Sequence, residues 1–354
     1  MRRTWLSMAA ATALLVGACS AAASPTPTTG PTAEPTPSPS PIALPAPGNI
    51  LKTGKVVGSE IPLSAAQEAL IKATSKGKLV GIVATTMTTE YHKLLNESAQ
   101  KRAQDLGYTA EICDSQIDTA KALQCFEGFV SKGATIIMTS SSAETLGAAV
   151  KEATGKGIVV VQVTGTDLGD AGAITLSVDN ISIGLSEGKG AGEYAAKTWP
   201  DQAVEAIILD YPDFASLIDR ADAIERAMLA ANPKIVVDGR FKGGTADLGV
   251  ANTEIALQKY PNFKILVGIN DGGDLGGYQA LVTAGKGPAD VAVFGIDCDP
   301  QAVALIDQGT MYKGCVDTNP SGTGELAINA ANRLLAGADV PGFVEVPVTV
   351  YAGK

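Results

Sequence analysis

The sequence predicts an α/β protein with two lobes, each built on a doubly wound parallel sheet. Apolar runs alternate with amphipathic helical segments, many of the runs are apolar on both faces, and the pattern starts again after residue 179. Strands that alternate with helices form right-handed crossovers and parallel sheets, whose strands are buried on both faces. The 39 glycines and the 18% of charged residues suit the tight turns of such a fold.

The amino-terminal segment is typical of an exported lipoprotein. Arg2 and Arg3 precede an apolar run at 8–16, which is the layout of a signal peptide and is too short to span a membrane. The sequence Val-Gly-Ala-Cys that ends at Cys19 resembles the lipobox of bacterial lipoproteins. This resemblance implies that 1–19 is a lipoprotein signal peptide and that acyl chains on Cys19 anchor the protein to the outer face of the cell membrane. An ordinary signal peptide with a chance cysteine is the alternative.

Two segments separate this anchor from the first lobe. Residues 20–48 are nearly all Ala, Ser, Thr and Pro, a composition that forms no core and behaves as a semi-extended tether. Residues 49–77 begin irregularly, and 64–76 predicts a helix with Ser64 as its N-cap. We expect this amino-terminal extension to pack on the outside of the first lobe.

The first lobe is predicted to comprise 78–178 and 319–341. Its elements follow from apolar runs that end at turn residues, such as Gly107, which is placed to cap a helix. The predicted strands are 79–85, 109–113, 135–139, 158–164 and 174–178, and the predicted helices are 90–106, 119–131, 143–154 and 321–335.

The second lobe is predicted to comprise 179–318 and 342–354. The same alternation of apolar strands and amphipathic helices defines it. The predicted strands are 204–210, 234–241, 265–267, 292–297 and 344–351, and the predicted helices are 183–199, 216–231, 246–260, 301–308 and one opened by the glycine-rich turn after Asp271.

Composition excludes several classes of function. The formal net charge of −10 argues against a nucleic-acid partner, because phosphate binding needs clustered Lys and Arg. A single histidine leaves little material for a His-rich zinc site or a His-based catalytic triad. The glycine-rich segment 188–192 lies inside a predicted helix and does not follow a strand, so it is not a dinucleotide loop. We therefore expect no metal, no cofactor and no catalytic residue.

The cysteines are expected to form two disulfides. Lipidation of Cys19 leaves four cysteines in an oxidising compartment. Three pairings are possible, and we favour Cys113 with Cys125 and Cys298 with Cys315, because sequence neighbours lie in adjacent strand–helix units. Each bond would stabilise the fold by about 3 kcal/mol in the chain-entropy model. A metal site is the rival interpretation, but the chain has no Cys-x-x-Cys spacing.

Polar side chains end two neighbouring strands of the second lobe. Asn270 follows the apolar run at 265–267, and Asp297 ends the next predicted strand. Ligands of open α/β sheets bind at the carboxyl ends of the strands, where such side chains project. Capping of the following helices is the alternative role for both residues. Asp271, beside Asn270, is the better candidate for a cap alone.

A resemblance to a known family rests on five segments. They read LVGIVATTMTTEYHKLLNESAQKRAQDLGY, LSVDN, VGINDGGDLGGYQAL, VAVFGID and DQGTMYKGCVDTNPSGTGELA. Together they resemble the type I periplasmic sugar-binding proteins of ABC transporters, the ribose-binding group in particular, over 78–354. The resemblance implies two lobes joined by three crossovers, hinge closure on a solute, delivery to a permease, and hydroxyl binding by Asn270 and Asp297.

The same resemblance assigns roles at the first strand end. The segment Thr-Thr-Glu-Tyr-His at 88–92 falls where the family carries Asn-Pro-Phe-Phe. By this match Tyr91 is a stacking face, Thr89 is a polar contact, and His92 replaces the second aromatic ring. The alternatives are a core role for Tyr91 and a surface or packing role for His92.

The chain also departs from the family pattern. Thr164 and Gly165 stand where the family commonly has an Asp-Arg pair, and Ile218 stands where it has an arginine, although Arg220 is close. These differences leave the identity of the solute open, so no aldopentose or aldohexose specificity is carried over.

Two approximate matches to the family suggest further contacts. A family glutamine falls near Asp317 and Thr318, and a family phenylalanine falls near Gly244, with Phe241 three residues earlier. Phe214, in the turn after a predicted strand, is a weaker ligand contact.

The sequence therefore predicts a lipid-anchored solute-binding protein of an ABC importer. Its ligand is expected to be a small polar molecule, most simply a sugar, and the protein is expected to be a monomer without enzymatic activity. A nucleoside or an autoinducer is an alternative ligand. A receptor for chemotaxis or a sensor kinase is an alternative function, as is an enzyme on this scaffold, for which Asp297 and His92 are the available candidates.

Overall fold

The computed structural model describes residues 42–353, except 53–55, 58–60, 142 and 164–167. The predicted signal peptide, Cys19 and Thr164 therefore lie outside the described residues. Two large sheets carry the two lobes, and a short third sheet pairs β1 (Ile50–Leu51) with β13 (Val340–Pro341). In this part of the chain no helix combines the length and the apolar character that a membrane crossing needs.

The sheet of the first lobe is parallel throughout. Its strand order is β2-β14-β7-β6-β5-β3-β4. The strands are β2 (Val56–Val57), β3 (Leu79–Ala84), β4 (Thr109–Asp114), β5 (Ile136–Thr139), β6 (Val159–Val163), β7 (Ile174–Ser177) and β14 (Phe343–Glu345). The order reverses between β3 and β5, so a topological switch point lies there. The extension adds β2 to the edge of this sheet, beside β14.

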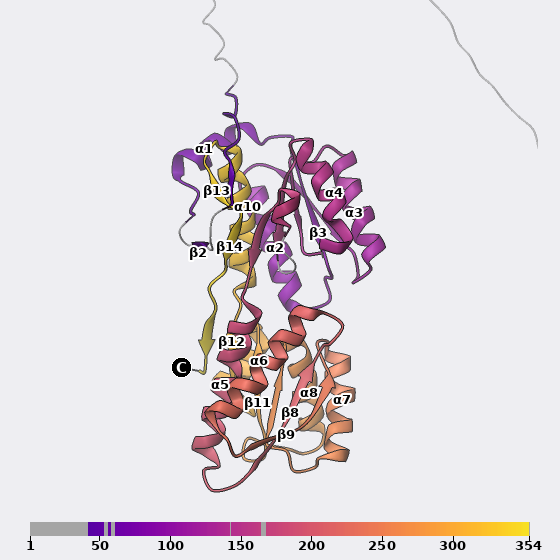
Figure 1. The fold of residues 1–354 in the computed structure, drawn as a ribbon, viewed down its shortest axis with the longest axis vertical. Helices are drawn as coiled ribbons and strands as arrows, with labels where there is room; N and C mark the ends of the chain where they lie inside the picture. Colours follow the sequence, from indigo (N-terminus) through magenta and orange to yellow (C-terminus); the bar gives the residue numbers. More distant parts are fainter. Residues whose placement is uncertain (1–41, 53–55, 58–60, 142, 164–167, 354) are drawn as a thin grey trace, which may run out of the picture. The chain divides into compact units, whose positions relative to one another are not determined.

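Helices cover both faces of the first sheet (Figure 1). One face packs against α2 (Glu90–Asp105) and α10 (Pro320–Leu335), and the other packs against α3 (Thr119–Ser131) and α4 (Ala143–Gly155). A single 3-10 turn, η2 (Gly169–Ala171), precedes β7.

The amino-terminal extension also forms the predicted helix, α1 (Ala65–Thr74). The side chain of Ser64 accepts a hydrogen bond from the Gln67 amide, and the Gln67 side chain accepts one from the Ser64 amide, which completes a capping box. Ile71 of this helix is fully buried in the same core as the α2 face of the sheet. The extension is therefore an integral part of the lobe surface.

The sheet of the second lobe repeats the same order. Its strands run β15-β12-β11-β10-β8-β9, parallel except for β15. They are β8 (Val204–Asp210), β9 (Ile235–Lys242), β10 (Ile265–Gly268), β11 (Ala292–Ile296), β12 (Tyr312–Asp317) and β15 (Thr349–Tyr351). Here the order reverses between β8 and β10, which places a second switch point at the ends of those strands.

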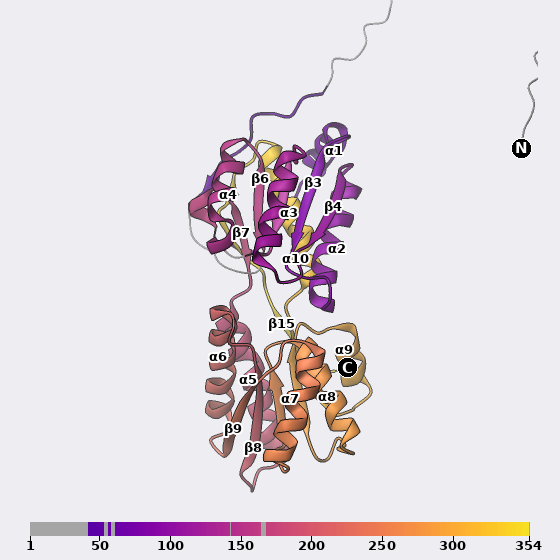
Figure 2. The same cartoon turned by 90° about the vertical axis from the view of Figure 1, so that its right-hand side faces the viewer.

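Figure 2 shows the helices on the two faces of the second sheet. One face packs against α5 (Asn180–Thr198) and α6 (Ala215–Ala231). The opposite face carries α7 (Ala246–Lys259), α8 (Asp271–Thr283) and α9 (Pro300–Asp307). The predicted fold class, two doubly wound parallel-sheet lobes, is confirmed.

The described chain passes three times between the two sheets. The connections are β7 to α5, β12 to α10, and β14 to β15. The prediction of one strand over 344–351 is wrong, because β14 pairs with β7 whereas β15 pairs with β12. Pro347 lies between them and has no N–H to continue a ladder. The first lobe therefore extends to Glu345, and the predicted boundary at 341/342 is corrected.

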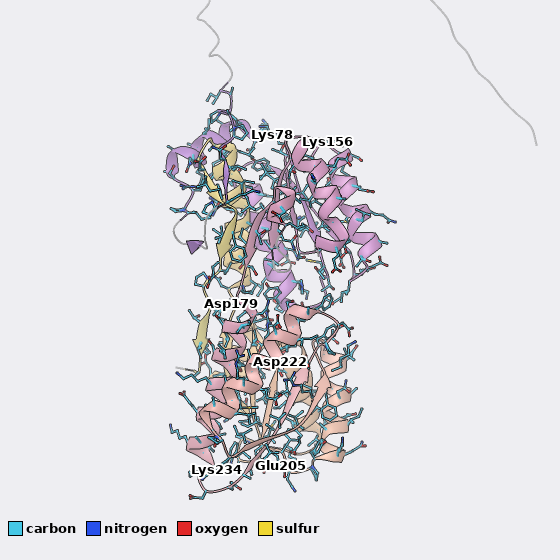
Figure 3. All side chains as sticks on the ribbon, viewed as in Figure 1. Lys78, Lys156, Asp179, Glu205, Asp222 and Lys234 are labelled. Atoms are coloured by element: carbon cyan, nitrogen blue, oxygen red, sulfur yellow. A yellow bond between two sulfur atoms is a disulfide. The ribbon has the colours of Figure 1, made fainter. Side chains whose placement is uncertain are left out.

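Labelled side chains in Figure 3 show the direction of the strands within each lobe. Lys78 and Lys156 precede β3 and β6 at the amino end of the first sheet, and they lie away from Asp179. In the second lobe, Glu205 and Lys234 mark the amino ends of β8 and β9. The carboxyl ends of the second sheet are thus the ends nearer Asp179, where the chain enters this lobe.

Glycines allow α5 to pack closely against α6. A Cβ atom at Gly188 would lie 2.0 Å from the carbonyl oxygen of Ile224, and one at Gly184 would lie 2.3 Å from the carbonyl oxygen of Arg220. Both partners are backbone atoms, so neither can move without shifting the helix. Helix packing thus explains Gly188 in the glycine-rich segment 188–192.

We predict that Gly188→Ala lowers the free energy of unfolding by about 1–3 kcal/mol, because the methyl group overpacks this contact. Urea unfolding of the purified protein measures the change. Gly190→Ala is the matched control, since a Cβ added there would have nothing within 4 Å of it. That substitution should stabilise the same helix by up to about 1 kcal/mol, and equal effects of the two changes would contradict the packing argument.

Candidate functional site

Asn270 is held at the carboxyl end of β10 by two hydrogen bonds. Its side-chain oxygen accepts a hydrogen bond from the Gly273 amide at 3.1 Å, which caps α8. Its side-chain nitrogen donates to the carbonyl oxygen of Gly244 at 3.1 Å. Asn270 therefore caps the helix, the alternative that the sequence left open, and it also connects the tip of β10 to the loop after β9.

Asp271 is not a helix cap, contrary to expectation. It is fully buried, and its carboxylate accepts hydrogen bonds from the Tyr312 hydroxyl at 2.5 Å and from the Asp299 amide at 2.6 Å. Gly295 leaves room for it, because a Cβ there would lie 2.1 Å from Oδ1 of Asp271. These donors and this space turn the side chain towards the sheet, and burial raises its pKa well above the usual range.

Asp297 follows β11 and has an unusual backbone. Its φ of 107° and the φ of 52° at Cys298 both lie in a region that residues other than glycine rarely adopt. The Thr318 hydroxyl donates to Oδ1 of Asp297 at 2.8 Å, and the Asp297 amide donates to the carbonyl oxygen of Val316 at 2.8 Å. Asp297 is only 7% exposed. The structure thus brings two predicted site residues, Asp297 and Thr318, into direct contact.

Arg220 lies beside this carboxylate. The guanidinium is buried and donates to the Asn180 side chain at 2.9 Å and to the carbonyl oxygen of Ile269 at 2.7 Å. Burial raises the pKa of Asp297 to about 7, while the charge of Arg220 opposes that increase. Burial likewise lowers the pKa of Arg220, and the charge of Asp297 opposes that decrease. Arg220 and Asp297 therefore interact electrostatically, and the pKa of the carboxyl lies near neutral pH.

An aromatic pair lies at the second switch point. The rings of Tyr211 and Phe214 stack with centroids 5.8 Å apart, and Phe214 is 44% exposed. A Cβ at Gly244 would lie 2.6 Å from Cδ2 of Tyr211, so this ring fills the space next to the glycine. Gly244 in turn contacts Asn270. The structure therefore places an aromatic face beside Asn270.

Phe241 has a different environment. Its ring packs edge-on against Tyr260 at 6.4 Å and belongs to the core on the α7 face of the sheet. The rings closer to the position of the family phenylalanine are those of Phe214, which is exposed, and Tyr211, which lies against Gly244.

Asp317 and Thr318 lie where β12 ends and the chain returns to the first lobe. Asp317 is half-buried and accepts a hydrogen bond from the Asn319 amide at 2.7 Å. Asn319 caps α10 from a left-handed backbone conformation with φ of 50°. This connection positions Thr318 against Asp297.

The first lobe contributes a compact group at the start of α2. Thr89 caps the helix, and its hydroxyl lies 2.7 Å from Nδ1 of His92. The rings of Tyr91 and His92 meet edge to face at 5.2 Å. Burial lowers the pKa of His92 to about 4, so the imidazole is neutral at pH 7. The structure thus groups three predicted site residues.

Residues at the start of α2 interact electrostatically with residues of the second lobe. Burial first, and then the charge of Glu90, raise the pKa of Asp299 to about 6. Arg220 interacts electrostatically with Tyr91 in addition to Asp297. Residues from the start of α2 therefore act on the same groups that surround Asp297.

Sequence reasoning missed Tyr211 and Asp299, and it did not include Arg220 among the site residues. Arg220 was visible as a charged residue next to the position expected for an arginine. Tyr211 directly follows a predicted strand, which is the signal that identified Asn270. Asp299 acts through its backbone amide, which donates to Asp271, and no sequence pattern marks that contact.

The structure pairs the cysteines in the way favoured from sequence. The sulfur atoms of Cys113 and Cys125 are 1.96 Å apart, and those of Cys298 and Cys315 are 2.04 Å apart. Among the described residues, no group of three or more His, Cys, Asp and Glu side chains is arranged to hold a metal ion.

Comparisons with known proteins agree with this architecture. A model of a family described as "Periplasmic binding protein domain" matches residues 80–339. The ribose import binding protein of Haemophilus influenzae is 26% identical over 287 residues, which cover 80% of this chain and 94% of that protein.

Solved structures share the fold. A periplasmic solute-binding protein of an ABC transporter from Actinobacillus succinogenes, with bound D-allose, matches with a TM-score of 0.69 and 20% identity, over 78% of this chain and 97% of that one. The 5-methylthioribose transporter solute-binding protein of Thermotoga lettingae matches with a TM-score of 0.69 and 22% identity, over 78% and 86% of the two chains.

We predict that the Asp297 carboxyl makes the free energy of unfolding fall as the pH rises from about 4 to about 7. In the unfolded chain Asp297 releases its proton near its ordinary pKa of 3.8, whereas in the folded protein it does so near 7. The folded state therefore holds an extra proton in this window, and stability decreases with pH. Asp297→Asn should remove about 1–4 kcal/mol of that decrease, as measured by urea unfolding at pH 4.5 and 8.

Asp201→Asn is the control, because Asp201 is exposed. It should keep the wild-type pH profile. If Asp297→Asn and wild type show the same slope, the carboxylate does not titrate as stated.

Proposed function

The chain belongs to the family of periplasmic binding protein domains, and on this premise we propose that it is the solute-binding protein of an ABC importer. It binds a small, uncharged, sugar-like molecule at the strand ends of its two lobes and delivers it to a permease. The observation that carries the proposal is the arrangement around Asp297, where a carboxylate, a hydroxyl and a guanidinium meet at the carboxyl end of a parallel sheet.

The charges around the site favour an uncharged ligand. Arg220 donates hydrogen bonds to Asn180 and Ile269 and interacts electrostatically with Asp297. Arg240 forms ion pairs with Asp222 and Glu225, each at 2.6 Å. A cation that is already neutralised offers little to an anionic solute, because a new anion would have to displace its present partner.

Lys242 is occupied in the same way. Its amine pairs with Asp213 at 2.6 Å and lies 4.7 Å from the centre of the Tyr211 ring. Within the described part of the second lobe, the cations next to the strand ends thus have partners already, and the ligand is neutral.

The polar groups of the site suit hydroxyls. Each sugar hydroxyl both donates and accepts, so a carboxylate such as Asp297 and an amide such as Asn270 are appropriate partners. The Tyr211–Phe214 pair offers an apolar face to a sugar ring. The names of similar proteins agree with this class: one is a ribose import binding protein, and two others hold D-allose and 5-methylthioribose.

We assign ligand contacts to both lobes. From the first lobe they are Thr89, Tyr91, His92 and Thr164, and from the second Phe214, Asn270, Asp297, Asp317, Thr318 and, in addition, Tyr211. Tyr211 takes the aromatic role that the sequence suggested for Phe241, because its ring lies against Gly244. A ligand that touches both groups favours a closed arrangement of the lobes by its higher affinity for that state.

Binding requires no bond-making chemistry. His92 is neutral and hydrogen-bonded to Thr89, and Asp297 is engaged by Thr318. These two residues were the candidates for catalysis. Because each is hydrogen-bonded to a different partner, they do not form an acid–base pair with each other. The proposed protein therefore releases its solute unchanged.

The proposed cellular context is the outer face of the cell membrane. The lipobox-like sequence at Cys19 and the tether that follows support a lipid anchor. The two cysteine pairs support export, since disulfides persist in oxidising compartments. We propose that the protein acts there as a monomer, with a permease as its partner.

We predict that an uncharged sugar or polyol raises the melting temperature of the purified protein lacking 1–19. Ligands that bind only the folded state stabilise it by about 2.7 kcal/mol at a hundred times their Kd. Thermal shift assays with D-ribose, D-allose, myo-inositol, adenosine, glutamate and phosphate measure the effect. Stabilisation by glutamate or phosphate alone would sink the neutral-ligand proposal.

We predict that Asp297→Asn and Asn270→Ala weaken binding of the stabilising solute about 10–100-fold. The first change removes a charged hydrogen-bond acceptor, and the second removes an amide that Gly244 and Gly273 hold in place. Isothermal titration calorimetry measures the affinity. Asp201→Asn, at an exposed turn, is the control and should bind as wild type does. Unchanged affinity of the Asp297→Asn protein would place the ligand elsewhere.

We predict that Cys19→Ser releases the full-length protein from the membrane fraction, because the residue then lacks the thiol that carries the acyl chain. Cell fractionation and incorporation of a radiolabelled fatty acid report the outcome. Wild-type protein without label would show that the signal peptide is an ordinary one.

A further inference from the structure

The backbone at the end of β11 adopts a conformation that needs support. Asp297 has φ of 107° and Cys298 has φ of 52°. Consecutive residues with positive φ that are not glycine persist only where neighbouring structure holds them, and such residues concentrate at functional sites. We refer to residues 297–299 as the Asp297 turn.

Contacts from two directions hold the Asp297 turn. Its amides donate to the carbonyl oxygen of Val316 at 2.8 Å and to the carboxylate of Asp271 at 2.6 Å. Cys298 is also bonded to Cys315, whose Cα lies 5.3 Å away on β12. Cys315 is aligned with Gly295, which comes before the turn. The bond therefore folds the turn back over the neighbouring strand.

This cysteine pair is joined to the ligand-binding groups on both sides. Cys298 directly follows Asp297, and Cys315 lies on the strand that ends at Asp317 and Thr318. The Thr318 hydroxyl then reaches Asp297. The ends of β11 and β12 are thus connected twice, by the disulfide and by the hydrogen bond from Thr318 to the Asp297 carboxylate.

The other cysteine pair differs in its surroundings. Cys113 on β4 and Cys125 on α3 both have ordinary negative φ values, since neither is among the residues with positive φ. Their side chains belong to the core on the α3 face of the first lobe. The chain thus offers an internal control: two disulfides that close loops of similar length, 12 and 17 residues. Of their four cysteines only Cys298 has a positive φ, and the positive-φ residues of the other loop, Gln116 and Ile117, lie three and four positions beyond Cys113.

We propose that the Cys298–Cys315 disulfide is a positioning element of the binding site, which fixes the left-handed Asp297 turn and so aims the Asp297 carboxylate at the solute. The inference rests on the proposed function, because it states that the disulfide raises the affinity of the protein for its solute. It predicts that loss of this bond weakens ligand binding, whereas loss of Cys113–Cys125 affects stability alone.

The first test compares the double variants C298A/C315A and C113A/C125A. Similar loop lengths predict similar decreases in melting temperature. Calorimetry with whichever of D-ribose, D-allose and myo-inositol stabilises the wild type should show about 10–100-fold weaker binding for C298A/C315A and a change of less than about 3-fold for C113A/C125A. Equal affinities of the two variants would overturn the proposal.

A glycine variant separates positioning from general stability. Glycine adopts φ near 52° without a steric penalty, whereas alanine does not. C298G/C315A should therefore recover most of the affinity lost by C298A/C315A, although it lacks the same disulfide. If glycine binds no better than alanine, the bond acts by something other than the backbone conformation, and the proposal fails.

A measurement without ligand distinguishes this inference from the proposed function. Carbon-13 NMR titration of the Asp297 carboxyl should give a pKa near 7 in the wild type. In C298A/C315A it should move towards the ordinary value as the turn opens to water, and in C298G/C315A it should stay raised. If none of the uncharged solutes in the panel binds, the proposed function fails, and this titration alone decides whether the disulfide positions Asp297.

Discussion

The buried guanidinium of Arg220 is the constraint on which the polar strand ends of the second lobe depend. A buried charge is costly unless it is paired and fully hydrogen-bonded. Arg220 donates hydrogen bonds to two segments, to Asn180 at the start of α5 and to the carbonyl oxygen of Ile269 before Asn270, and it interacts electrostatically with Asp297. The first crossover and the tip of β10 are therefore connected through one side chain, whose charge also acts on the end of β11.

Small residues make this concentration of polar groups possible. Asp271 occupies the space above Gly295, and the fully buried Asp274 lies above Gly268, where a Cβ would come within 2.2 Å of its carboxylate. Burial raises the pKa of both carboxyls well above their usual range. Glycine at these two strand positions allows acidic side chains to pack against the sheet. At this end of the sheet, buried carboxyl groups therefore lie where apolar side chains would otherwise pack.

Much of the fold could be predicted from sequence because parallel strands buried on both faces leave a strong local signal. The helix predicted at 119–131 has the bounds of α3, and Ser64 caps α1 as expected. The division of 344–351 between two sheets could not be predicted, since both halves read as β-structure and only long-range pairing separates them.

The candidate site was predictable in position and not in detail. Asn270 and Asp297 were found because they end apolar strands. The orientation of Asp297 depends on Thr318 and on Cys298 in a left-handed conformation, which are contacts between different strands. Tyr211 was missed because its neighbour Gly244 lies on the next strand's loop. Residue type identifies a strand end, whereas tertiary contacts decide what each side chain does there.

The three connections between the sheets also favour one order of folding. Apart from β15, the second sheet is built from one continuous stretch of chain, whereas the first sheet must wait for α10 and β14, which come later in the sequence. Joining α10 to α2 before the intervening stretch is compact would close a very long loop, at an entropic cost that grows with loop length. Once the second lobe has collapsed, its entry and exit points lie near each other, and the loop becomes effectively short. We therefore expect the inserted lobe to be compact before the discontinuous lobe is completed.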